Sequence, residues 1–172
     1  CKNVRENVGL LDMSAFAKCR IKGPGAEEFL DKLVANKLPK KVGRINLCHA
    51  LNTKGGVHSE FTIMRESENS FYLVSAGAFQ RLDHDWIHKW MPKDGSVIFE
   101  NLTNSMGVLV VSGPKARELM QRVSTDDFSN ENFKWLSSKM VDVGQAPVNA
   151  MRVNFVGELG WELHHPIEYQ NH

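Results

Sequence analysis

The stretch Arg20–Val34, RIKGPGAEEFLDKLV, joins the end of a strand to a helix through a glycine-proline break. Proline is favoured at the start of a helix, where its missing N–H would have no partner in any case. After the break, apolar residues recur at the i, i+3, i+4, i+7, i+8 spacing that marks one helix face. These residues are Ala26, Phe29, Leu30, Leu33 and Val34. The stretch therefore predicts a strand followed by an amphipathic helix.

The same pattern returns about ninety residues later in the chain. Val108–Val111 is an apolar run that predicts a buried strand, and Ser112–Pro114 interrupts it. Helical spacing then resumes at Ala116, Leu119, Met120 and Val123. Two strand-Gly-Pro-helix units predict two related lobes, at about residues 1–100 and 101–172. Unrelated proteins with mixed helices and strands use this local pattern too, so duplication stays one of two interpretations.

The segment Asn52–Ile63, NTKGGVHSEFTI, predicts a turn that leads into a strand. Alternation places Val57, Ser59, Phe61 and Ile63 on one face of this strand, and His58, Glu60 and Thr62 on the other. Ser70–Ser75 predicts its antiparallel partner in a hairpin. A carboxylate in the middle of a strand is unfavourable unless its face is solvated or functional, and taken alone Glu60 favours the solvated interpretation.

The remaining segments complete an α+β pattern. A helix is predicted where Phe79, Leu82, Trp86, Ile87 and Trp90 line one face, and it ends near a proline. Further strands are predicted at Ser96–Phe99, Met140–Val143, Ala150–Phe155 and Gly157–Leu163. The predicted class is α+β, with mostly antiparallel sheets and packed helices.

Composition narrows the classes of function. The 172 residues are 42% hydrophobic and 24% charged, as in ordinary globular proteins, and the net charge of +1 offers no field that would attract nucleic acid or an anionic membrane. No apolar run is long enough to span a membrane. Three widely spaced cysteines favour a reducing, intracellular setting.

Two short histidine patterns are candidates for catalytic or metal sites. His84 and His88 have the i, i+4 spacing of zinc peptidases, but Asp85 stands where that pattern has Glu, and no third ligand is apparent. A metal-dependent hydrolase is therefore the less favoured alternative, and no metal is expected. Cys48 and His49 are adjacent on a predicted strand and point to opposite faces, so they cannot form a nucleophile-base pair.

Two carboxylates flank the glycines of Gly157–Glu162, GELGWE. One carboxylate can accept both hydrogen bonds from a ligand edge that presents two adjacent N–H donors, as pterins and guanines do. Glu158 and Glu162 are both candidates for this contact. The competing interpretation is that they are ordinary acidic residues of a turn.

Four segments, in this order along the chain, carry a resemblance to a known family. They are VGLLDMSAFAKCRIKGPGAEEFLDKLVAN (8–36), LNTKGGVHSEFTI (51–63), GVLVVSGPKAREL (107–119) and MRVNFVGELGWELHH (151–165). Together they resemble the folate-binding aminomethyltransferase domain of the glycine cleavage T-protein family. The likeness extends to the C-terminal folate domain of dimethylglycine and sarcosine dehydrogenases. It covers nearly the whole chain, which corresponds to the upper half of the family's domain, so residues 1–172 are expected to be an incomplete domain.

The resemblance implies roles for five residues. The catalytic acid falls on Glu60, where T-proteins have Asp, and this chain therefore departs from the pattern by one methylene. An aromatic residue near the ligand falls on Tyr72, and a backbone contact to the pterin falls on Val74. The pterin-binding acid falls on Glu162. The family's Tyr falls on Phe155, which keeps the stacking surface and lacks the hydroxyl.

The resemblance also implies an activity, which is tetrahydrofolate-dependent aminomethyl or methylene transfer in glycine, sarcosine or dimethylglycine catabolism. The implied cofactor is tetrahydrofolate, and FAD is expected only in a fused upstream domain. The implied partners are folate, an amine-derived one-carbon unit, and an upstream flavin domain or a lipoyl carrier protein, in the bacterial cytoplasm or the mitochondrial matrix. Because Glu replaces Asp, a non-catalytic folate-binding or structural domain is the first alternative.

Overall fold

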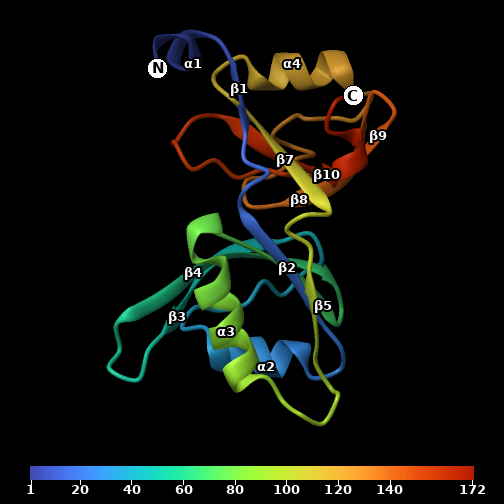
Figure 1. Ribbon diagram of the computed structural model, residues 1–172. Coiled ribbons are helices and arrows are strands. Elements are labelled where there is room, and N and C mark those ends of the chain that lie inside the picture. The colour runs from blue at the N-terminus through green and yellow to red at the C-terminus, as the bar shows by residue number, and fades with distance from the viewer. The chain divides into compact units, whose positions relative to one another are not determined.

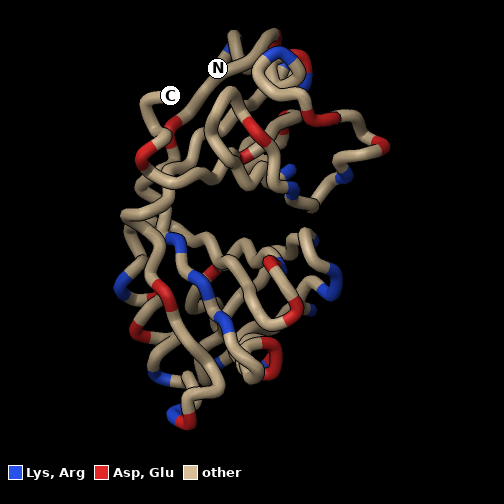
Figure 2. Tube along the Cα trace, turned by 90° about the vertical axis from the view of Figure 1, so that its right-hand side faces the viewer, with Lys and Arg blue, Asp and Glu red and all other residues tan.

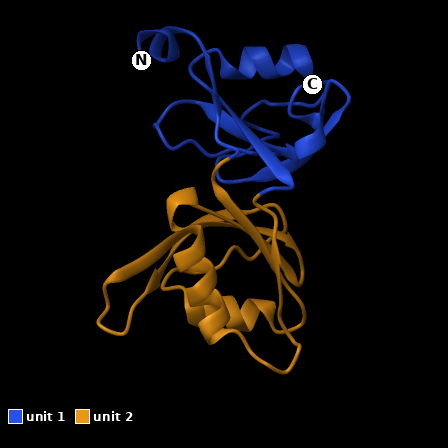
Figure 3. Ribbon diagram, in the orientation of Figure 1, with its two compact units in different colours: residues 1–14, 104–172 blue, residues 15–103 orange.

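The computed structural model describes all 172 residues, which form two compact units (Figure 3). Unit 1 contains residues 1–14 and 104–172, and unit 2 contains residues 15–103. The boundary at 103/104 lies close to the division that the sequence predicts near residue 100. Residues 1–14, which that division assigns to the first lobe, form part of unit 1 together with the second half of the chain.

Unit 2 is a five-stranded antiparallel sheet with helices on one face (Figure 1). The strand order is β3-β4-β5-β2-β6. The strands are β2 (Ala17–Lys22), β3 (Ile45–Leu51), β4 (Val57–Ser67), β5 (Ser70–Ser75) and β6 (Ile98–Asn101). The helices are α2 (Ala26–Leu33), the 3-10 turn η1 (Gly77–Phe79) and α3 (Gln80–Trp90).

The core of unit 2 lies between this sheet and α2 and α3. Alternate residues of each strand point into it, so that Phe61 and Ile63 of β4 and Leu73 of β5 are buried beside Leu30 of α2 and Ile87 of α3. The intervening residues of β4 and β5 point to the opposite face of the sheet. That face carries the residues for which the sequence predicts a function.

Unit 1 is a second five-stranded antiparallel sheet, in the order β1-β7-β10-β9-β8. Its strands are β1 (Gly9–Asp12), β7 (Met106–Ser112), β8 (Ser138–Val143), β9 (Ala146–Met151) and β10 (Gly160–Pro166). Its helices are α1 (Lys2–Glu6), α4 (Ala116–Val123) and the 3-10 turn η2 (Ile167–Tyr169). An aromatic cluster fills the core, in which Phe128 and Phe133 lie with ring centroids 5.2 Å and 5.9 Å from that of Trp161.

The two units share one topology. The sheet of unit 2 has the order β3-β4-β5-β2-β6, and the sheet of unit 1, read from its other edge, has the order β8-β9-β10-β7-β1. Corresponding strands therefore occupy the same positions, with α2 and α4 as the corresponding helices. The Gly-Pro break that follows β2 in unit 2 and β7 in unit 1 is the same in both, because Gly23 has φ +120 and Gly113 has φ +133, and an added Cβ at either would collide with backbone. The structure therefore contains two units of the same topology, one for each of the two strand-Gly-Pro-helix segments. The edge strand β1, which precedes the repeat in sequence, completes unit 1.

The predicted α+β class with mostly antiparallel sheets is confirmed, and two local predictions need correction. The strand expected at Ala150–Phe155 ends at Met151, and residues 152–159 form a turn between β9 and β10. His58 does not share the face of Glu60, because the pairing of β3 with β4 shifts register at Ala50/Leu51 and the His58 ring stacks on Trp86 of α3 at 4.1 Å.

The surface shows no dominant charge. Basic and acidic residues both occur along the trace of each unit (Figure 2). The net charge of +1 gives the chain no strong overall field that would attract a polyanion or a polycation. No helix combines the length and the apolar composition needed to cross a bilayer.

Candidate functional site

Glu60 lies in the middle of β4, on the face of the sheet that points away from the core. Its neighbour Phe61 is 1% exposed and packs in the core, whereas 54% of the Glu60 side-chain surface is exposed. A strand places successive side chains on opposite faces, so the burial of Phe61 directs Glu60 outward. The carboxylate is thus held by a rigid strand and is accessible to a ligand.

His49 of β3 is the direct cross-strand neighbour of Glu60. Its Nε2 lies 2.8 Å from Oε2 of Glu60. The sequence predicts no role for His49, because it was considered only as a base for Cys48. The two are indeed separated, since Cys48 is fully buried in the core while His49 reaches the outer face.

Tyr72 and Val74 of β5 lie on the same outer face as Glu60. In the β4–β5 ladder, Val74 pairs with Thr62 and Tyr72 pairs with Met64. Thr62 and Met64 come two and four residues after Glu60, so their side chains and those of their partners point to the same face of the sheet as Glu60. Tyr72 is 2% exposed and Val74 is 6% exposed. The structure therefore brings these three predicted residues of unit 2 onto one hairpin face.

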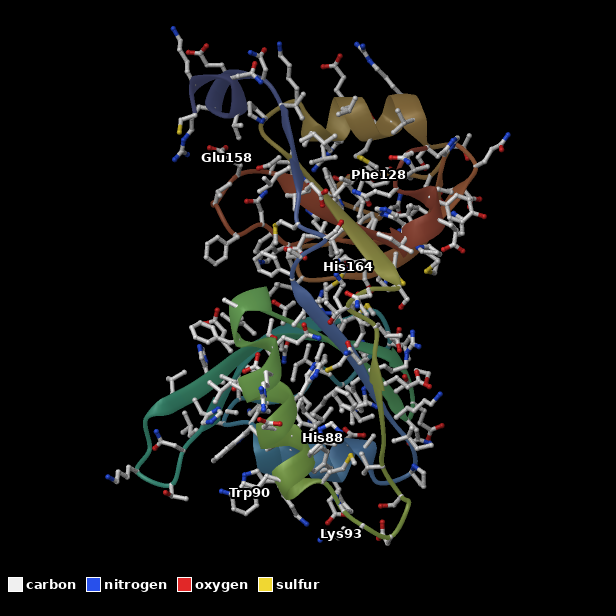
Figure 4. All side chains as sticks on the ribbon, viewed as in Figure 1. His88, Trp90, Lys93, Phe128, Glu158 and His164 are labelled. Atoms are coloured by element: carbon white, nitrogen blue, oxygen red, sulfur yellow. The ribbon has the colours of Figure 1, made fainter.

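Glu162 lies on β10 of unit 1, between Val110 of β7 and Met151 of β9. It is 8% exposed, and its Oε2 accepts a hydrogen bond from Nε2 of His164 at 3.2 Å. Figure 4 shows His164 in the sheet of unit 1. A buried carboxylate needs such a donor, because an unpaired charge loses its hydration on burial.

The repeat relates Glu162 to a predicted residue of unit 2. Tyr72 lies opposite Arg20, three residues before Gly23, and Glu162 lies opposite Val110, three residues before Gly113. The two predicted ligand contacts therefore occupy equivalent positions in the two sheets. Sequence comparison of the lobes by eye does not reveal this, because the side chains are of different chemical types.

The structure distinguishes the two acidic residues of the glycine turn. Glu158 forms an ion pair with Arg5 of α1, the helix beside which it lies in Figure 4. Glu162 instead lies inside the sheet, with only one of its oxygens engaged. Each carboxylate has one oxygen in a contact, and the two residues differ in surroundings, because Glu162 lies in a strand of the sheet and Glu158 lies in a turn.

Phe155 lies in the turn between β9 and β10, and 87% of its surface is exposed. An aromatic ring this exposed contributes little to the core and offers both faces for stacking. Phe155 and Glu162 belong to unit 1, and Glu60, Tyr72 and Val74 belong to unit 2.

Two hollows include none of the five predicted residues in their lining. One, of about 510 Å³, belongs to unit 2 and is lined by α2 and α3, including Phe29, Leu33, Trp86 and Trp90. The other, of about 420 Å³, belongs to unit 1 and is lined by Trp135, Arg152, and the turn that contains Glu158. Sequence reasoning predicted neither hollow, since each depends on side chains from separate elements.

The histidines of α3 form an aromatic cluster with β6. The ring centroids of His84 and His88 lie 4.8 Å and 4.6 Å from that of Phe99. His88 also donates a hydrogen bond from Nδ1 to the backbone oxygen of His84 at 2.7 Å, and burial lowers the pKa of His84. No group of three or more His, Cys, Asp or Glu side chains is arranged to hold a metal ion.

Comparison with known proteins places this architecture in a family. Residues 1–172 match the model of the GCVT N-terminal domain. The chain is 40% identical over 168 residues to mitochondrial dimethylglycine dehydrogenase of Homo sapiens, covering 97% of this chain and 19% of that protein. It is 33% identical over 174 residues to the mitochondrial pyruvate dehydrogenase phosphatase regulatory subunit of Mus musculus, covering 99% of this chain and 20% of that protein.

Among solved structures, the glycine cleavage system aminomethyltransferase T from Bartonella henselae superposes with a TM-score of 0.83. It is 22% identical, and the match covers 97% of this chain and 44% of that one, so this likeness concerns the fold. The chain spans about a fifth of the length of the curated relatives it matches. With its whole length matched by the GCVT N-terminal domain, the chain belongs to the glycine cleavage T-protein family.

Proposed function

We propose that this chain forms part of a tetrahydrofolate-dependent one-carbon transferase, with Glu60 as the residue that accepts the proton released during transfer. The observation that carries the proposal is the placement of Glu60. It is a half-exposed carboxylate in the middle of a strand, on the non-core face that it shares with Tyr72 and Val74. A carboxylate in this position contributes little to folding, which favours a chemical role.

The residues present fit a reduced pterin. Oε2 of Glu162 is held by His164, and Oε1 makes no other hydrogen bond within the chain, so it can accept from an N–H edge. The exposed ring of Phe155 offers an apolar surface on which a flat heterocycle can stack. Val74 of unit 2 is paired with Thr62 of β4 and Lys18 of β2, so its backbone belongs to the sheet, and its side chain is the part that lies on the face of Glu60.

The chemistry asked of Glu60 is a single proton transfer. Tetrahydrofolate, when bound, supplies two neighbouring amine nitrogens that capture a carbon unit at the oxidation level of formaldehyde. As an amine nitrogen forms its bond to carbon, the ionised Glu60 carboxylate accepts the N–H proton. General base catalysis of this kind contributes about 10² to 10⁴ in rate. Positioning of the reactants beside the carboxylate contributes further through proximity.

The donor in this proposal is an amine-derived one-carbon unit from the oxidation of an N-methyl amine such as dimethylglycine or sarcosine. Similarity to dimethylglycine dehydrogenase supports that source, and a flavin domain upstream of this chain is then the partner that performs the oxidation. An aminomethyl group on a lipoyl carrier is the alternative donor. The proposed location is the mitochondrial matrix or the bacterial cytoplasm.

A non-catalytic role is the second candidate, because one relative is named a regulatory subunit rather than an enzyme. A titration of the intact protein with reduced folate, with tryptophan fluorescence as the signal, tests binding. A formaldehyde-capture assay then tests transfer. Binding with transfer supports the proposal, binding without transfer favours the non-catalytic alternative, and the absence of both refutes the folate assignment.

A further inference from the structure

We infer that His49 is a positioning residue for Glu60, which it holds through Nε2–H so that the second carboxylate oxygen faces the reacting amine. This inference rests on the proposed function. The contact joins Nε2 of His49 to Oε2 of Glu60 at 2.8 Å, within the range of a charge-assisted hydrogen bond. An ionised carboxylate only accepts hydrogen bonds, so Nε2 must carry the hydrogen.

The pair has no competing partner. Glu60 forms no ion pair other than the one with His49. On the outer face, the next cross-strand pair along β3 and β4 is Leu47 with Thr62, and neither side chain is charged. The other edge of β3 contacts the backbone of Ala35, within a segment that carries no acidic residue. The orientation of the Glu60 carboxylate is therefore determined by one side chain.

A glutamate has greater need of this restraint than an aspartate. Its additional methylene adds a rotatable bond, and a freely rotating carboxylate spends little time in the reactive orientation. About 63% of the His49 side chain is covered, since 37% is exposed, so the imidazole itself is only partly free to move. A hydrogen bond from this ring restricts the longer side chain to one rotamer family.

The equivalent strands of unit 1 pair without a histidine-carboxylate contact. In unit 1, Val141 and Val148 occupy the cross-strand positions that Cys48 and Phe61 have in unit 2, and both pairs are in the core. The next pair outward is Asp142 with Pro147, where unit 2 has His49 with Glu60. The same sheet thus forms without a histidine-carboxylate pair.

A double-mutant cycle on the intact protein tests the inference. His49→Ala should lower single-turnover carbon transfer by about 10- to 100-fold, the effect of one lost charge-assisted hydrogen bond, with folate affinity unchanged. His49→Gln, whose amide can still donate, should recover most of the rate. His88→Ala, which changes an exposed histidine of α3 in the same unit, is the control and should transfer at the wild-type rate.

The second side of the cycle uses Glu60→Asp, which withdraws the carboxylate by about 1.5 Å and breaks the contact. In that background His49→Ala should change the rate by less than about twofold, because the interaction is already absent. Equal losses in both backgrounds would overturn the inference, as would a wild-type rate for His49→Ala.

Two further readouts separate this inference from the proposed function. If Glu60→Gln transfers carbon at the wild-type rate, Glu60 is not the base. The proposed function then fails, and His49 has no base to position. If Glu60→Gln is inactive while the His49 variants are fully active, only the positioning role fails. The ¹⁵N spectrum of His49 reports on the contact directly, and a neutral ring protonated at Nδ1 instead of Nε2 would contradict it.

Discussion

Replacing Glu162 by glutamine keeps the shape of the side chain and removes one of its two acceptor oxygens. In the structure, Oε2 bonds to His164 at 3.2 Å, and only 10% of the side-chain surface is exposed. Glutamine can keep that bond through its single carbonyl oxygen. Its NH₂ group then faces the ligand where the native side chain presents an acceptor.

The expected loss follows from that geometry. A hydrogen bond to a charged group is worth about 1.5 to 3 kcal/mol, so the dissociation constant for reduced folate should rise by about 10- to 100-fold. The free energy of unfolding should change by about 1 kcal/mol or less, since the bond to His164 survives. Fluorescence titration and urea unfolding measure the two quantities.

Glu158→Gln is the matched control, because Glu158 lies four residues earlier in the same segment and pairs with the exposed Arg5. The dissociation constant of Glu158→Gln for reduced folate should stay within about twofold of the wild-type value. An unchanged affinity for Glu162→Gln, or equal losses in both variants, would refute the assignment of Glu162 to the ligand edge.

Three further outcomes follow from the fold. Gly23→Ala should lower the free energy of unfolding by about 2 kcal/mol or more in urea, because φ is +120 and the added Cβ collides with backbone oxygen. Burial raises the pKa of Cys19 to about 12 and of Cys48 to about 11, so a thiol reagent at about pH 8 should label one cysteine per native chain and three after unfolding. A hydrogen bond from Lys22 lowers the pKa of Glu100 below 4.5, so its stabilisation is complete above that pH and is lost as the pH falls through the lower folded value. Glu100→Gln should flatten that acid-side decline in denaturant unfolding.

The helices and central strands could be predicted because their signals are local. The Gly-Pro breaks at Gly23 and Gly113 mark residues with positive φ, and the apolar spacing after each break defines one helix face. The pairing of β1 with β7 could not be predicted, since it joins residues about one hundred positions apart and leaves no periodic signal. The strand end at Met151 was also missed, because alternation continues into a turn.

The partner of Glu60 was missed for a specific reason. No strand is predicted before the Gly55-Gly56 turn, and continuing the Leu51–Val57 pair of the structure without a bulge would place Glu60 opposite Cys48. The register shift at Ala50/Leu51 moves the pairing by one residue and brings His49 opposite instead. A bulge depends on packing of the whole hairpin, so the sequence does not reveal it.

The roles of Tyr72, Val74, Phe155 and Glu162 came from the family resemblance, and they stay predictions. The structure adds the equivalence of Tyr72 and Glu162 in the repeat and the exposure of Phe155. Neither property is visible in the sequence, because register and burial are determined by contacts between distant segments.

Transfer by Glu60→Gln in the intact protein tests the central claim most directly. Glutamine is nearly isosteric, so folding and folate affinity should stay close to wild type, while the amide cannot accept the proton. With the oxidation step that supplies the carbon monitored separately, transfer to tetrahydrofolate should fall by about 10² or more. Transfer at the wild-type rate would contradict the account and return Glu60 to a solvated side chain on the outer face of β4.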